Sequence, residues 1–493
     1  MASKLPPTKN QTLVIAPLFL PKSMPPQQDT SHPAPLQLER ALGPLTAGAL
    51  LAGTVIGTGI FLVPSTMARE TGSVAGVFLV WLFGAILSLC GAFTYAELGS
   101  SLPAAGGEYV FLRKAYGPLW GFLFGWQQIV IGKTGSIAAI GLAASLFLSH
   151  LYPPLTEDIL TVEGFKVSGM QVLAIGWIAL MTFINVFGVG RGGALQALLT
   201  ALKLGAILGL IGIAFTSGEG SWDHFTATST ATTESPTRGT FIGYGAALAA
   251  ALWAYDGWNN LTMVSGEIRQ PHKTIPRVLI IGILGVAAIY ILTNLAYFLI
   301  LPLEEVQKTQ GVAQEVAIRL LGENGGKALT LAAILSTLAA LNGAILAGAR
   351  IFYAMADDGL LYRGLNRLHP RFKTPIRALL LQALLATLLI LILGHDKVAF
   401  ERVLDYALLG TWGFYGLTSI AVIVLRVRHP ELPRPYLTVG YPYIPLIFSL
   451  VAFLFCCSIA LRRPEESLLG LALLLLGVPF YLYFKGSTPQ GKP

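Results

Sequence analysis

Long apolar runs, separated by short polar connections, dominate the chain from residue 42 onward. The first, Leu42 to Ala68, has 27 residues without one charged side chain, enough to cross a hydrocarbon core of about 30 Å at 1.5 Å per residue. Further runs follow at about 74–95, 117–149, 170–187, 194–215, 240–265, 278–301, 328–349, 378–394, 403–425, 441–460 and 468–484. Lipid offers no water to unpaired backbone groups, and the runs lack the alternation of a barrel strand. The pattern therefore predicts an all-α polytopic membrane protein with 12 transmembrane helices.

The composition agrees with this fold class and excludes several functions. Hydrophobic residues make up 54% of the chain and charged residues 12%, where a soluble protein carries about a quarter. The net charge of +8 is typical of basic cytoplasmic loops in a membrane protein, so we expect no nucleic-acid partner. The three cysteines, Cys90, Cys456 and Cys457, lie inside apolar runs, and the histidines form no metal-binding or catalytic pattern. We therefore expect neither an enzyme nor a metal or organic cofactor.

The basic residues also orient the chain. With the N-terminus inside, 20 of the 33 lysines and arginines fall on the inner face and ten on the outer face. This asymmetry favours a multi-pass protein of the plasma membrane with both termini in the cytoplasm. Residues 1–40, with eight prolines, are predicted to form a disordered cytoplasmic tail, and 486–493 a second, short tail.

Two of the spans are interrupted at mid-length. Gly-Thr-Val-Ile-Gly-Thr-Gly-Ile-Phe at 53–61 interrupts the first, and Ala-Tyr-Asp-Gly-Trp-Asn-Asn at 254–260 interrupts the sixth. If spans one to five (about 42–216) and six to ten (about 240–426) are two halves, Gly57 and Asp256 stand at matching positions. Because five is odd, the halves have opposite orientation, and an inverted repeat with paired breaks is typical of secondary transporters. Glycines that merely permit close helix packing are the alternative, but packing does not explain Asp256.

A helix unwound at mid-membrane exposes backbone groups that can bind a small dipolar molecule. The N–H groups near Thr58, Gly59 and Ile60, at the positive end of a half-helix, are suited to a carboxylate. Carbonyl groups near Val55 and Trp253 are suited to an ammonium group. An α-amino acid carries both groups a few ångströms apart, so the breaks predict an amino-acid site.

The side chains beside the second break allow two interpretations each. Asp256 can contact a cationic or hydroxyl-bearing substrate, or it can cap the broken helix through an internal hydrogen bond, and Asn259 can act similarly. Trp253 and Tyr255 flank the break and are candidates for a lid. Aromatic residues in membrane helices more often serve as packing or interface anchors, so both roles stay open.

Two lysines lie deep inside predicted spans. Lys203 is mid-way along the fifth span, too far from either surface to reach water easily. It can couple transport to a proton, stand as a permanent ammonium group where a sodium ion sits in other transporters, or tie backbone carbonyls together. Lys133 in the third span raises the same question, but no second feature of the sequence supports a role for it.

Several motifs, taken as a set, resemble the L-type amino-acid transporter family of the amino acid, polyamine and organocation superfamily. They are the two interrupted segments, Ala-Arg-Ile-Phe-Tyr-Ala-Met-Ala-Asp-Asp-Gly at 349–359, Glu97-Leu-Gly followed by Pro-Ala-Ala-Gly-Gly-Glu-Tyr at 103–109, Gly266-Glu267 with Pro271, and Lys203. The resemblance covers most of 42–485 and is greatest to bacterial members such as the serine/threonine exchanger. It implies a LeuT-like bundle over 41–485 with a 5+5 inverted repeat, broken helices 1 and 6, two added helices at about 441–484, and a place in the bacterial inner membrane.

The resemblance also assigns roles to residues. Substrate would be bound by residues of both breaks, namely Val55, Ile56, Gly57, Thr58, Gly59, Ile60, Trp253, Asp256 and Asn259. Trp253 would gate the site, beside Tyr255 as the second lid candidate named above, and Lys203 would act in coupling near Ser336 of the eighth span. Exchangers and proton symporters of the family both have this lysine, so it does not decide the coupling. Animal members bind a glycoprotein through a cysteine in the loop between spans three and four, and His150 to Ser168 contains none, so we expect no disulfide-linked heavy subunit.

The predicted function is secondary transport of amino acids by alternating access, as an exchanger or a proton-coupled symporter. A transporter of polyamines or other cationic amines is one alternative, because Asp256 can meet a second cation. Such substrates lack the carboxylate that the first break is suited to bind. The second alternative is a non-transporting amino-acid sensor of the same fold, which would bind amino acids without carrying them across the membrane.

Overall fold

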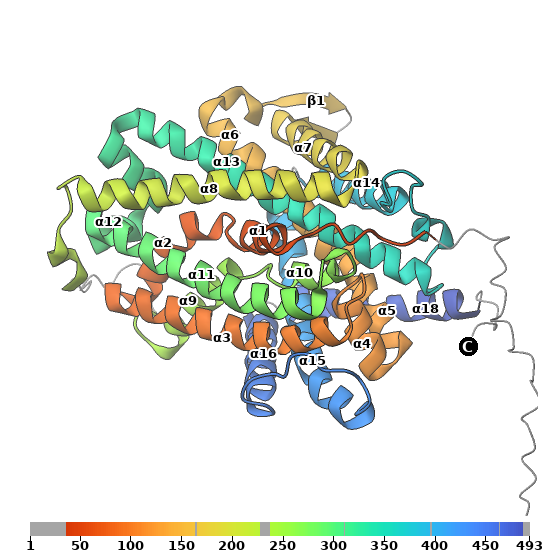
Figure 1. Ribbon diagram of the computed structural model, residues 1–493. Coiled ribbons are helices and arrows are strands. Elements are labelled where there is room, and N and C mark those ends of the chain that lie inside the picture. The colour runs from red at the N-terminus through yellow and green to blue at the C-terminus, as the bar shows by residue number, and fades with distance from the viewer. Residues whose placement is uncertain are drawn as a thin grey trace, which may run out of the picture. The chain divides into compact units, whose positions relative to one another are not determined.

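The computed structural model describes residues 36–162, 165–226, 237–309, 311–394, 397–462 and 464–486. Of the two predicted tails, only 36–40 and residue 486 fall within these ranges, so the predicted disorder lies outside the described residues. Apart from one hairpin, the regular structure of the described chain is helical (Figure 1).

The chain up to residue 226 contains the interrupted first span and one hairpin. Its helices are α1 (Pro44–Val55), α2 (Gly59–Thr71), α3 (Val74–Ser101), α4 (Glu108–Tyr116), α5 (Pro118–Gln127), the π-helical turn η1 (Gln128–Gly132), α6 (Lys133–Leu151), the 3₁₀ turn η2 (Pro153–Thr156), α7 (Gly169–Val186), α8 (Val189–Thr216) and the 3₁₀ turn η3 (Trp222–Thr226). Strands β1 (Asp158–Val162) and β2 (Phe165–Ser168) pair antiparallel between η2 and α7.

From residue 237 onward, all the regular elements of the described chain are helices. It forms α9 (Phe241–Ala254), α10 (Asn260–Met263), the 3₁₀ turn η4 (Ser265–Glu267), α11 (Pro271–Ile300), α12 (Leu303–Lys308), α13 (Val312–Asp357), the 3₁₀ turn η5 (Arg363–Asn366), α14 (Ile376–Leu393), α15 (Lys397–Arg428), α16 (Tyr443–Arg462), α17 (Pro464–Leu475) and α18 (Gly477–Gly486).

The helices agree with the predicted spans. Among the described residues, ten helical stretches are long and apolar enough to cross a membrane, and the bent pair α1 and α2 makes an eleventh. The predicted sixth span corresponds to α9, an apolar helix of only 14 residues, followed after a short gap by α10. Large apolar side chains such as Phe183, Ile281 and Phe453 are exposed, as expected of helices that face acyl chains. The polytopic helical fold is confirmed, while the count of 12 stays a prediction.

Polar residues between the apolar runs begin several helices. Ser73 and Thr240 each accept a hydrogen bond from the third residue of the helix that follows, α3 and α9 respectively. At the start of α7, Ser168 and Gln171 cap each other's backbone N–H groups in a capping box. Gly72 ends α2 with φ 70°, a left-handed value that favours glycine. These local contacts fix where the spans begin and end.

Three irregular features were not predicted. The third span contains the π-helical turn η1, where the hydroxyl of Thr134 donates to the carbonyl of Ile129 five residues earlier. The loop between spans three and four contains the hairpin of β1 and β2. The long helix α13 bends at Gly322, whose φ of 68° is left-handed. Each depends on local backbone geometry that an apolar pattern does not encode.

The two interrupted helices lie at the centre of the bundle. Helix α1 packs against α8, α11 and α13, while α2 packs against α9 (Figure 1). The most enclosed span is α13, where 89% of the membrane-spanning stretch is buried, compared with 22% for α16 and 17% for the last span. Helices α16 to α18 therefore lie at the periphery, and α1, α2 and α13 form the interior.

A buried ion pair joins α13 to the segment after α10. The guanidinium of Arg350 donates to both carboxylate oxygens of Glu267, at 2.7 and 2.9 Å, and neither residue is exposed. The backbone carbonyl of Glu267 in turn accepts from the N–H of Leu42, just before α1. This pair links three parts of the interior at the end of the bundle where α1 begins.

We expect Arg350→Gln to cost about 3–5 kcal/mol of folding free energy, because it leaves the Glu267 carboxylate buried without its cation. Unfolding of the purified protein in detergent measures the loss. The matched control is Arg319→Gln, whose partner Glu305 is exposed and whose loss should cost less than about 1 kcal/mol. Equal losses in the two variants would contradict the prediction.

Candidate functional site

The first break separates α1 from α2. Helix α1 ends at Val55, α2 begins at Gly59, and the two are bent by 42°. Ile56 leaves the helix with ψ 83°, and the N–H of Gly57 donates to the carbonyl of Val55 at 2.8 Å. Among the described side chains, none caps the start of α2, in contrast to α3, α7 and α9. Because the first N–H groups of a helix have no preceding turn to bond to, the start of α2 is suited to bind an anion.

The second break lies between α9 and α10. Helix α9 ends at Ala254, and the N–H of Asp256 donates to the carbonyl of Trp253 at 3.2 Å. Gly257 has φ 110°, which residues with a side chain rarely adopt. The chain becomes helical again only at Asn260.

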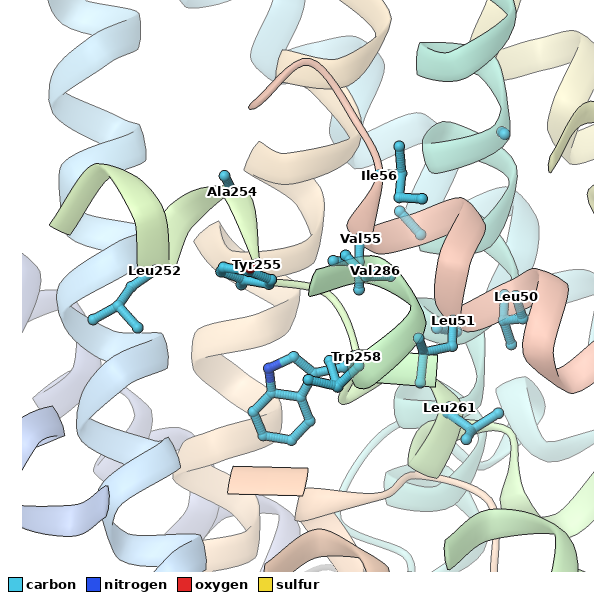
Figure 2. Packing of buried hydrophobic residues seen from close by; sticks show 14 of the residues in the cluster. Leu50, Leu51, Val55, Ile56, Leu252, Ala254, Tyr255, Trp258, Leu261 and Val286 are labelled. Atoms are coloured by element: carbon cyan, nitrogen blue, oxygen red, sulfur yellow. The ribbon is translucent and has the colours of Figure 1, made fainter. Parts of the chain in front are cut away.

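The two breaks are in direct contact. The hydroxyl of Thr54 in α1 lies 3.0 Å from the carbonyl of Gly257, and its one proton is shared with the carbonyls of Leu50 and Leu51 in its own helix. A Cβ on Gly59 would lie 2.7 Å from the Cβ of Ala254, so only glycine allows α2 to approach the end of α9 this closely. Figure 2 shows buried residues from the ends of α1 and α9 in one cluster with Val286 of α11. The close approach at Gly59 is thus made by the end of α9, the second broken helix.

Tyr290 of α11 joins the broken ends. Its hydroxyl lies 3.0 Å from the carbonyl of Val55 and 2.8 Å from that of Ala254, the last residues of α1 and α9. The ring is buried against Trp81 and Tyr255. A hydroxyl has one proton, so the two carbonyls share a single donor.

Lys203 lies at the C-terminal end of α1. Its ammonium group donates to the carbonyls of Gly53 at 2.8 Å, Ile56 at 2.5 Å and Ser336 at 3.2 Å, and its side chain is 1% exposed. The hydroxyl of Ser336 donates to the same Ile56 carbonyl at 3.1 Å. A cation here is favourable because the last carbonyls of a helix are unpaired and carry the negative end of its dipole. The two predicted coupling residues therefore meet at one backbone oxygen.

The remaining residues of the first break contribute mainly through their backbone. The side chains of Val55, Ile56 and Ile60 are buried in the apolar core. Thr58 is half-buried, and Gly57 borders open space, since a Cβ there would meet no other atom within 4 Å. Gly57 is thus the point in this break where the backbone is accessible to a small molecule.

The predicted side chains of the second break differ in their surroundings. Asp256 is half-buried and accepts a hydrogen bond from the hydroxyl of Tyr415 at 2.7 Å. Trp253 is 44% exposed, and its ring edge lies 3.8 Å from where a Cβ on Gly59 would stand. Tyr255 is fully buried in the aromatic cluster around the α11 tyrosine. In this conformation Trp253 is therefore the more accessible of the two predicted gating residues.

Asn259 and Asn260 connect the second break to two other helices. The amide of Asn259 donates to the carboxylate of Glu108 in α4 at 2.6 Å. The ammonium group of Lys133 in α6 donates to the side-chain oxygen of Asn260. All four residues are buried. The structure thus gives Lys133 a polar partner at the break.

The sequence contained weak signals for the residues that were missed. Tyr290 and Tyr415 stand in long apolar helices, where a buried hydroxyl needs a partner, but the sequence does not name that partner. Glu108 was visible in the Gly-Gly-Glu-Tyr segment at 106–109, as part of a motif and without a role. Only the folded chain brings these residues to the breaks.

Comparison with known proteins agrees with this geometry. The family model described as amino acid permease matches residues 42–467. The serine/threonine exchanger SteT of Bacillus subtilis is 32% identical over 451 residues, covering 91% of this chain and 97% of the exchanger. The b(0,+)-type amino acid transporter 1 of Mus musculus is 31% identical, and the cystine/glutamate transporter of Homo sapiens 30%, each over 91% of this chain and over 88% and 86% of their own lengths.

These matches confirm the resemblance to L-type transporters and the prediction of a transporter instead of an enzyme. They support a multi-pass membrane protein with an amino-acid substrate. The chain belongs to the amino acid permease family and is a secondary transporter of amino acids.

Proposed function

We propose that the substrate binds between the two breaks, in contact with the backbone of 55–60 and with Trp253, Asp256 and Asn259. The observation that carries this proposal is the contact of the breaks through Thr54 and Gly257 at 3.0 Å. Two unwound backbone segments that touch in the interior of a membrane protein need polar partners, and a zwitterion can supply both charges.

The carboxylate of the substrate binds at the start of α2. Support comes from the uncapped N–H groups of Thr58, Gly59 and Ile60 and from the open space beside Gly57. A polyamine has no group for this position, so amino acids fit the site better than the cationic amines that were the alternative.

The ammonium group of the substrate binds near the broken ends of α1 and α9. The Val55 carbonyl already accepts from Gly57 and lies within bonding distance of the Tyr290 hydroxyl. A substrate ammonium would therefore replace Tyr290 there and leave it to the Ala254 carbonyl. In the empty site the Tyr290 hydroxyl is the donor that the two carbonyls share, and in the occupied site the substrate ammonium takes its place at Val55.

Residues of the second break select the substrate and gate access to the site. Asp256 offers a carboxylate oxygen beside the one that Tyr415 holds, which favours side chains with a hydroxyl or a positive charge. Trp253 covers the site because its ring edge is close to Gly59. Tyr255, two residues after Trp253, supports the gate by anchoring the end of α9 in the buried aromatic cluster of Trp81 and Tyr290.

Lys203 is a fixed cation that holds the first break, with Ser336 as its partner. Three carbonyl acceptors match the three N–H donors of a charged ammonium group. This favours exchange over proton symport, in agreement with the B. subtilis relative, whose name is that of an exchanger.

The wider arrangement follows from the same proposal. We place residues 42–216 and 240–426 as two inverted halves, 441–484 as added helices, and both termini in the cytoplasm of a bacterial cell, as the basic residues favour. The chain works without a disulfide-linked heavy subunit, since His150 to Ser168 lacks cysteine and Cys90, Cys456 and Cys457 lie within α3 and α16.

Purified protein in liposomes should take up labelled amino acids when the liposomes are preloaded with amino acid, and much less when they are empty. The panel contains neutral, hydroxyl-bearing and cationic amino acids and putrescine, each with and without a pH gradient. Binding without uptake in any condition would identify a sensor, and uptake of putrescine alone would identify an amine transporter. Either result would refute the proposed function.

Gly57→Val should leave the protein folded and raise KM for the transported amino acid about tenfold or more, because its side chain enters the open space beside the break. The control is Gly176→Val in α7, where a Cβ also meets no atom within 4 Å but no site is proposed. Transport kinetics in liposomes measure both. An unchanged KM in the Gly57 variant would show that the substrate does not bind beside Gly57.

Lys203→Met should lower exchange about tenfold or more at every pH and leave the shape of the pH profile unchanged, because it removes the cation from the end of α1. Lys327→Met, at an exposed position of α13, serves as the control and should retain exchange. If a pH gradient drives uptake into empty liposomes and only this uptake is lost in Lys203→Met, the lysine couples transport to protons and its role as a fixed cation is wrong.

A further inference from the structure

A second buried polar network surrounds the second break and the start of α10. It consists of Glu108 in α4, Lys133 in α6, the consecutive residues Asn259 and Asn260, and Asp256 with Tyr415. Four different helical elements and the second break meet here. A polar network of this size in a dry interior is costly unless its hydrogen bonds are met.

Glu108 decides how the Asn259 amide is oriented. An ionised carboxylate only accepts hydrogen bonds, so the group of Asn259 that faces Glu108 at 2.6 Å must be its NH₂. The carbonyl oxygen of the same amide is then the end left for a substrate. A glutamine in place of Glu108 would not impose this choice, because it can accept or donate.

Lys133 stabilises the ionised form of Glu108. Its ammonium group is held on Asn260, one residue from Asn259, and it interacts electrostatically with both Glu108 and Asp256. The second carboxylate oxygen of Glu108 is buried and has no hydrogen-bond partner among the described residues. The hydrogen bond from Asn259, with the cation of Lys133 nearby, therefore stabilises this carboxylate.

We infer that Glu108 is a positioning residue of the substrate site, which turns Asn259 so that it presents a hydrogen-bond acceptor to the amino acid. This inference rests on the proposed function and deepens it. Together with Asp256, it makes the second break rich in acceptors, so the site prefers amino acids whose side chains donate hydrogen bonds, such as threonine, over isosteres that do not, such as valine.

The test exchanges the two partners of the hydrogen bond. Glu108→Gln frees the Asn259 amide, and Asn259→Asp alone sets two carboxylates against each other. In Glu108→Gln with Asn259→Asp, the new glutamine donates to the new aspartate, and an acceptor again faces the substrate. KM, kcat and the threonine-to-valine ratio of kcat/KM are measured in liposomes for all three variants. Gln171→Met is the control, because it removes a buried hydrogen bond between α7 and α14, away from both breaks.

We expect Glu108→Gln to lower the threonine-to-valine ratio about tenfold with little change in kcat, and the double variant to restore the ratio to within about threefold of the starting protein. The control should keep the ratio. An unchanged ratio in Glu108→Gln, or a double variant no better than the single ones, would overturn the inference. If the single variants do not fold, an active double variant supports the pairing and an inactive one overturns it. Failure of the unsubstituted protein to bind any amino acid would instead refute the proposed function.

Discussion

Unpaired backbone groups in a water-free interior are the constraint on which this molecule depends. Each break leaves carbonyl and N–H groups without helical partners, and lipid cannot supply any. Side chains from other helices supply hydrogen-bond partners for some of these groups. Lys203 and Ser336 take the carbonyls at the end of α1, and Tyr290 bridges the ends of α1 and α9. Among the described side chains none caps the start of α2, and this is the end of the break at which we propose that the substrate carboxylate binds.

The breaks also depend on close backbone approach. Gly59 and Gly257 stand where a side chain would collide with the opposite break or strain the backbone. Gly57, in contrast, borders open space. Gly57, Gly59 and Gly257 therefore serve two purposes. Two of them bring the broken helices together, and the third keeps a space open beside them.

Much of the fold was predictable because apolar length and charge are local properties of the sequence. All the predicted spans except the sixth correspond to helical stretches long enough to cross a membrane, and the break in the first was visible from its glycines. The π-helical turn, the hairpin and the kink at Gly322 were not, because they depend on backbone detail. In the site, Lys203 and Asp256 were found because charge is costly inside a membrane. Tyr290 and the Glu108 contact were missed because a partner 36 or 151 residues away cannot be read from spacing.

The two lysines of the interior illustrate how the same residue type can serve two purposes. Lys203 contacts only backbone carbonyls in the described structure, so its charge is matched to the dipole of α1. Lys133 contacts the side chain of Asn260, and its charge is matched to the carboxylates of Glu108 and Asp256. One lysine therefore stabilises the first break and the other the second. Each break is thus held by a cation from a different helix, the first by Lys203 of α8 and the second by Lys133 of α6.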